Sequence, residues 1–137
     1  MRVVLDTNTL VSALGWAGTP HRLLRACMQG KLEFFISPAL IDELSLVITY
    51  PKLKVVAMHP DLPRVMAWLC RPEHLVIPRQ QISVIVEDPP GNRVLECALE
   101  ASAGAIVSGD EHLLKLKNFD GIPILKSFEA CNIWNIA

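Results

Sequence analysis

The sequence predicts a three-layer α/β/α domain with a central, mainly parallel sheet. Three observations indicate this fold class. Short apolar runs rich in Val, Ile and Phe recur along the chain, helical patterns lie between them, and the length of 137 residues suits a single domain spanning residues 1–137. The runs occupy residues 3–5, 34–37, 82–86, 105–108 and 123–125, and residues 75–77 are ambiguous.

The runs are predicted to be strands buried on both faces, because they lack the alternation of a half-exposed strand. The segments between them carry helix signals. Thr19 and Ser37, each followed by Pro, are predicted N-caps for helices over 21–28 and 38–49. Asp61 and Asp110 are possible caps for helices over 62–70 and 111–117, and a further helix is expected over 90–102, with Arg93, Glu96 and Glu100 on its polar face.

Composition excludes several classes of protein. Hydrophobic residues make up 51% of the chain and charged residues 20%, which excludes a disordered tail, a fibre and a coiled coil. The net charge of −1 means that any nucleic acid must be bound through a local patch or a metal. The four cysteines form no C-x-x-C pair, and Asp6 interrupts the first apolar run too early for a secretion signal, so a cytoplasmic protein is expected. No apolar stretch is long enough to predict a membrane span.

Acidic residues follow three of the predicted strands. Asp6, Asp88 and Asp110 come after the runs that begin the chain, end near residue 86 and end near residue 108. Glu43 lies at the border of the apolar stripe of its helix, whereas Asp42 lies opposite the stripe. Since ligands of open parallel sheets bind outside the carboxyl ends of the strands, the four carboxylates are expected to converge there. Each also has a simpler reading, as a helix cap, a turn residue or a solvated charge.

Converging carboxylates repel one another, and a divalent cation removes that penalty. Mg²⁺ prefers carboxylate oxygens and water, and such a site can orient a water molecule and stabilise charge on a phosphodiester. The sequence has no nucleotide-binding glycine motif and no recognisable nucleophile triad. Residues 6–10, D-T-N-T-L, superficially resemble the haloacid dehalogenase signature D-x-D-x-T, but Asn8 replaces its second acid.

Taken in order along the chain, five stretches resemble a PIN domain. They are V-V-L-D-T-N-T-L-V-S-A from Val3, S-P-A-L-I-D-E-L from Ser37, E-D-P from Glu87, N-R-V-L-E-C-A from Asn92 and I-V-S-G-D-E-H-L-L from Ile106. The combination spans nearly the whole chain. It resembles the stand-alone prokaryotic PIN proteins described as toxin components of toxin–antitoxin pairs.

This resemblance implies a PIN-like, Rossmann-like fold and a ribonuclease that depends on Mg²⁺ or Mn²⁺. Asp6, Glu43 and Asp110 match its catalytic and metal-binding acids, Asn8 matches a residue that supports the first acid, and Ser108 matches the small hydroxyl position beside the site. The implied partners are RNA, an antitoxin protein and a second copy of the chain in a homodimer.

One position departs from the family pattern. Where the family usually has D-P-D-D-N, this chain has Asp88-Pro89-Pro90-Gly91-Asn92, so the third family acid falls on Gly91. Asp88 is a nearby candidate for a metal ligand in its place, and a water molecule or Asp110 is the alternative. An acid restored at residue 91 is expected to strengthen metal binding and to raise ribonuclease activity. Two functions therefore stay open: an active metal-dependent endoribonuclease, or a PIN-fold protein that binds RNA or an antitoxin with weakened catalysis.

Overall fold

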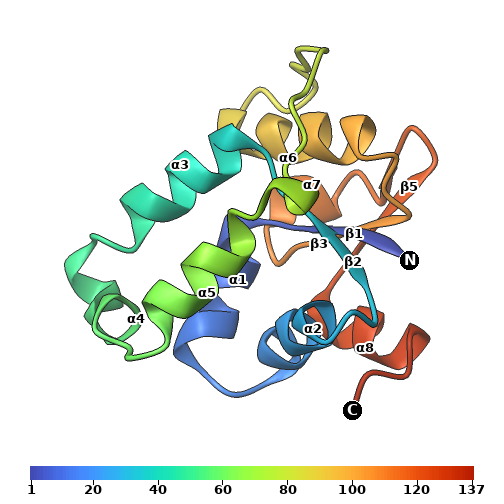
Figure 1. The fold of residues 1–137 in the computed structure, drawn as a ribbon. Helices are drawn as coiled ribbons and strands as arrows, with labels where there is room; N and C mark the ends of the chain where they lie inside the picture. Colours follow the sequence, from blue (N-terminus) through green and yellow to red (C-terminus); the bar gives the residue numbers. More distant parts are fainter.

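The structure, a computed structural model, describes all 137 residues and contains one five-stranded sheet (Figure 1). The strands are β1 (Arg2–Leu5), β2 (Glu33–Phe35), β3 (Ala105–Val107), β4 (Asn118–Phe119) and β5 (Ile122–Leu125). Their order is β2-β1-β3-β5-β4, with every neighbouring pair parallel except the antiparallel β4–β5 pair. This confirms the predicted mainly parallel sheet.

Helices lie on both faces of the sheet, which gives the predicted three layers. In Figure 1, α6 lies above the strands, while α2 and α8 lie below them. The helices are α1 (Thr7–Gly15), α2 (Thr19–Met28), α3 (Pro38–Val47), α4 (Lys54–Ala57), α5 (Leu62–Leu69), α6 (Pro89–Glu100), α7 (Glu111–Leu114) and α8 (Ser127–Ile133), with 3₁₀ turns at Pro51–Leu53 and Pro72–His74. One continuous apolar core of 34 buried residues joins the layers.

The central strands are almost completely buried, as their unbroken apolar runs predicted. Val3, Val4 and Leu5 of β1 are at most 1% exposed, and so are all three residues of β3. Because β2 and β3 pair with the two edges of β1, its carboxyl end lies in the middle of the sheet. Whatever follows β1 is therefore placed at the centre of the sheet edge.

The prediction of a strand at residues 82–86 is wrong. Side chains of α6, rather than a neighbouring strand, satisfy the backbone of this segment. Asn92 accepts a hydrogen bond from the Ile85 N–H and donates one to the Ile85 carbonyl, at 2.9 and 2.8 Å. Glu96 accepts from the Ile82 N–H at 2.8 Å. Only Ile82 and Ile85 are buried, three residues apart, while Val84 and Val86 are exposed.

Glu96 is consequently buried, contrary to its predicted place on an exposed face. Arg93 forms an ion pair with it at 2.9 Å and also donates to the Ile82 carbonyl. The ambiguous segment 75–77 contributes a single bridge, between Ile36 and Leu75. These polar contacts hold the loop that leads to Asp88 against α6.

The predicted helix caps are partly confirmed. The side chains of Ser37 and Asp110 accept hydrogen bonds from backbone N–H groups of α3 and α7, respectively. Thr19 is not the cap of α2: Gly18 is, and the Thr19 hydroxyl instead bonds Ser127 on α8 at 2.7 Å. Asp61 precedes α5 without a capping hydrogen bond.

Replacing Asn92 with Ala should destabilise the protein by about 2–4 kcal/mol, because both backbone groups of Ile85 lose their partner in a buried place. Urea denaturation monitored by circular dichroism measures this change. Gln81→Ala, in the same loop but exposed and without a side-chain hydrogen bond, is the control and should change stability by less than about 0.5 kcal/mol. Equal effects of the two substitutions would contradict the assigned role of Asn92.

Candidate active site

A cavity of about 150 Å³ lies at the carboxyl ends of β1 and β3. Five of the residues expected from the sequence line it: Asp6, Asn8, Glu43, Asp88 and Asp110. They come from α1 and its cap, α3, the cap of α6 and the cap of α7. Ser108 is not among the lining residues but hydrogen-bonds to Asp6. The expected convergence of the four carboxylates is therefore observed.

Asp6 is the most buried of the four, at 4% exposed. It is the N-cap of α1, and its Oδ1 accepts a hydrogen bond from the Thr9 N–H at 2.8 Å. Its Oδ2 accepts from the Ser108 hydroxyl. Burial raises the pKa of Asp6 above its ordinary value, and the bonds from Ser108 and Thr9 oppose that rise.

Ser108 connects two of the acids. Its hydroxyl donates to Asp6, and the same oxygen accepts from the Asp110 N–H at 2.9 Å. This short chain of hydrogen bonds joins the end of β3 to the end of β1. It explains why a small, buried hydroxyl occupies position 108.

Asp88 and Asp110 form a second connected pair. A hydrogen bond with Asp110 is the main cause that raises the pKa of Asp88 to about 6, and partial burial and the charges of Asp110 and Glu43 add to it. Asp88 does not follow a strand, as the sequence suggested, but occupies the N-cap position of α6. Asp88 is therefore protonated below about pH 6 and carries its charge at neutral pH, where the charges of Asp110 and Glu43 repel it.

Gly91 faces this pair from the first turn of α6. A Cβ built on Gly91 would lie 3.0 Å from Ile85 Cδ1 and 3.3 Å from Asp88 Oδ2, and its φ is not positive. Glycine is therefore not required by backbone strain here; it leaves space beside Asp88. The Asp88 carboxylate oxygen lies in close contact with the point where a side chain at residue 91 would begin.

Thr7 is a member of the site that the sequence reading did not single out. It lines the cavity and is 4% exposed, and its hydroxyl oxygen has no hydrogen-bond partner. A buried, unpaired hydroxyl costs free energy unless something polar binds it. Its position directly after Asp6 was the available signal.

The donor set suits a hard divalent cation. Four carboxyl groups and the unpaired Thr7 hydroxyl offer only oxygen ligands, which Mg²⁺ and Mn²⁺ prefer. As the side chains stand, no three acidic, histidine or cysteine residues enclose a common point. Separation of Asp88 from Asp110 is the rearrangement that would free two carboxylates for a cation.

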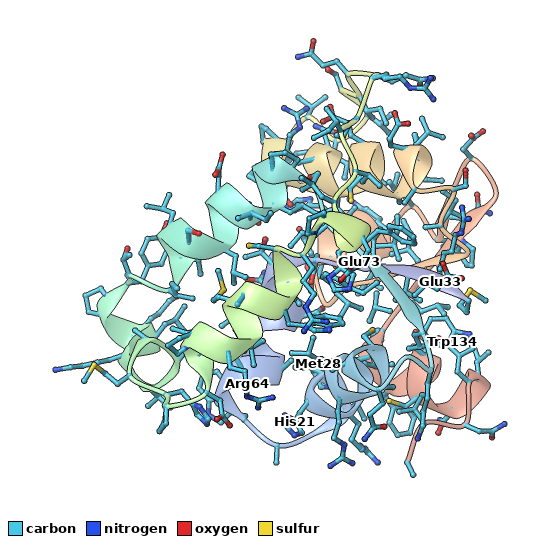
Figure 2. All side chains as sticks on the ribbon, in the orientation of Figure 1. His21, Met28, Glu33, Arg64, Glu73 and Trp134 are labelled. Carbon is cyan, nitrogen blue, oxygen red and sulfur yellow. The ribbon has the colours of Figure 1, made fainter.

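The largest cavity of the molecule, about 470 Å³, lies elsewhere, between α2 and α5. Figure 2 shows His21, Met28 and Arg64 beside this space. Asp61 is its only acid, and it pairs with Arg64 at 3.6 Å. The acidic residues that the sequence predicted line the smaller cavity and not this one.

The Asp88–Asp110 pair makes stability depend on pH. Since the pKa of Asp88 rises from 3.8 to about 6 on folding, its contribution to stability is present below pH 3.8 and is lost as the pH rises through 6. Asp88→Asn should remove this loss, so the variant should gain stability relative to wild type between pH 4 and pH 6. Urea midpoints measured with a chelator across that range test this, with Asp42→Asn as the exposed control; identical pH profiles for wild type and Asp88→Asn would contradict it.

Comparison with known proteins places the chain in a family. A family model for the PIN domain matches residues 2–112. An uncharacterized protein of Methanocaldococcus jannaschii, MJ1680, is 26% identical over 120 residues, which cover 86% of this chain and 76% of that protein. No solved structure shows a significant match. The matched region contains all four carboxylates as well as Thr7, Asn8 and Ser108. PIN domains are nucleases that typically use divalent metals. The chain belongs to the PIN-domain family.

Proposed function

We propose that this protein is a Mg²⁺- or Mn²⁺-dependent endoribonuclease that hydrolyses RNA phosphodiesters. The observation that carries the proposal is the meeting of Asp6, Glu43, Asp88 and Asp110 in one cavity with the unpaired Thr7 hydroxyl. Asp6, Glu43 and Asp110 are the proposed catalytic acids and metal ligands, with Asp88 as a further ligand. When bound, the cation would supply charge neutralisation and activation of water.

The chain's own residues prepare this site. Thr9 and Ser108 hold both oxygens of Asp6 in one orientation and leave each oxygen a further lone pair. The Asp110 side chain caps α7 by accepting from the His112 N–H at 2.9 Å, which fixes its direction. Asn8 lies at the cavity wall on the first turn of α1, where its amide can contact a substrate phosphate.

The biological setting is part of the proposal. We infer a toxin component of a toxin–antitoxin pair, acting in the cytoplasm as a homodimer controlled by an antitoxin protein, because the sequence resembles such PIN proteins. None of the helices has the length and hydrophobicity needed to span a lipid bilayer. Gly91 favours the second candidate function, a PIN-fold protein with weakened catalysis that binds RNA or an antitoxin.

A cleavage assay on mixed RNAs, with and without Mg²⁺ or Mn²⁺, tests the proposed function. Glu43→Gln should reduce metal-dependent cleavage by more than tenfold, because it removes a candidate ligand charge from the cavity. Asp42→Asn is a matched control, since it is the neighbouring acid of α3, is exposed and lies outside the cavity. RNA binding without cleavage under any metal condition would support the second candidate function instead.

Asp6→Asn should leave the protein folded and weaken binding of the divalent cation by at least about tenfold, or 1.4 kcal/mol. The asparagine oxygen can still cap α1, and removal of a buried charge offsets the altered bond to Ser108. Titration calorimetry with Mn²⁺ and thermal denaturation measure the two effects. An unfolded variant, or a folded one with unchanged metal affinity, would show that Asp6 is only a structural cap.

Gly91→Asp alone should destabilise the protein and fail to strengthen metal binding, because the new side chain meets Ile85 and Asp88. This revises the expectation drawn from the sequence. A second change, Asp88→Ser, keeps a good N-cap for α6 and removes the competing carboxylate. The double variant should therefore bind Mn²⁺ more tightly than either single variant; stronger binding by Gly91→Asp alone would show that Asp88 does not occupy the site of the family acid.

A further inference from the structure

We propose that a groove beside the acidic cavity binds one nucleotide of a single-stranded RNA, with Phe128 stacking on the base and Lys126 binding a phosphate; this inference rests on the proposed ribonuclease function. The groove has a volume of about 420 Å³. Its lining includes Asn8, Ser12, Ser108, Lys126, Ser127 and Phe128.

The groove is adjacent to the carboxylates. Asn8 lines both the groove and the acidic cavity, and Ser108 of the groove donates to Asp6 of the cavity. Lys126 and its neighbours directly follow β5, which pairs with β3. The groove and the cavity therefore occupy the same carboxyl edge of the sheet, so a chain bound in one continues into the other.

The size and lining of the groove fit a nucleotide better than those of the acidic cavity. Its volume of about 420 Å³ lies within the range of small-ligand sites, whereas the 150 Å³ of the acidic cavity is too small for a base and sugar. No acidic residue lines the groove. The groove itself therefore contributes no charge repulsion against the phosphates of RNA.

Lys126 supplies the positive charge. It is exposed and takes part in none of the ion pairs of the molecule. The nearby Glu129 uses its carboxylate to accept a hydrogen bond from the Lys126 backbone N–H at 3.0 Å. The ammonium group is therefore available for a phosphate.

Phe128 supplies the aromatic surface. It is 64% exposed and lines the groove, so its ring is open to a stacking base. Stacking of bases on exposed aromatic rings is tolerant of sequence and suits single strands.

The helix that carries these residues is anchored. The Ser127 hydroxyl bonds Thr19 at 2.7 Å, and the Cys131 thiol donates to the Thr19 carbonyl at 3.7 Å. Both contacts join α8 to the first turn of α2. The platform is thus ordered before RNA binds, which lowers the entropy cost of binding.

The test measures binding of a fluorescein-labelled ten-nucleotide oligouridylate by anisotropy, in EDTA and in an Asp6→Asn background, so that cleavage plays no part. Phe128→Ala should weaken binding by about 5- to 150-fold, the loss of one stacked base. Ile133→Ala is the matched control, because Ile133 is 61% exposed on the same helix but lies outside the groove. Its affinity should stay within about twofold of the parent, as for other exposed positions.

The logarithm of the affinity falls linearly with the logarithm of the salt concentration, and Lys126→Gln should make this slope less steep by about 0.7, the value for one phosphate contact with a single strand. Lys54→Gln, an exposed lysine on α4, should leave the slope unchanged. Equal effects of Phe128→Ala and Ile133→Ala, or an unbound oligouridylate, would overturn the nucleotide site. Failure of the proposed function is separate: it would appear as absent cleavage in the metal-dependent assay while these binding differences persist.

Discussion

The buried carboxylate of Asp6 is the interaction on which the rest of the site depends. It lies at the end of the central strand β1, where neighbouring strands on both sides exclude water from the backbone. A charge in that position is costly, and hydrogen bonds from Thr9 and Ser108 compensate for part of the cost. One of these bonds begins α1, and the other ties β1 to β3. The same contacts that stabilise the fold therefore orient the first acid of the site.

The second half of the site depends on the contacts between α6 and the segment before it. Asn92 and Glu96 hydrogen-bond to the backbone of that segment. Asp88, which follows it, therefore lies at the N-terminus of α6. Gly91 leaves room there, and Asp88 meets Asp110 across the cavity. Gly91, where the chain departs from the family pattern, is thus connected to the position of Asp88, three residues earlier.

The fold and most of the site could be predicted from the sequence. The apolar runs of β1 and β3, the caps Ser37 and Asp110, and the border position of Glu43 are local or periodic signals that survive in the structure. The prediction of a strand at 82–86 failed although the segment has the β-branched composition of a strand. Its backbone hydrogen-bonds to side chains fourteen and seven residues further along the chain, and not to a neighbouring strand. The prediction that Glu96 is exposed failed for the same reason, because its burial depends on a partner far away in the sequence.

The sequence by itself determined the two central strands, the family and the acids that line one cavity, because apolar runs, helix caps and residue spacing are properties of consecutive residues. Tertiary structure alone decided which polar groups pair. It joined Asp88 to Asp110, left Thr7 without a partner, and brought Lys126 and Phe128 beside Asn8 from the far end of the chain. These contacts lie between groups far apart in sequence, and their energies depend on burial and distance, which no local pattern encodes.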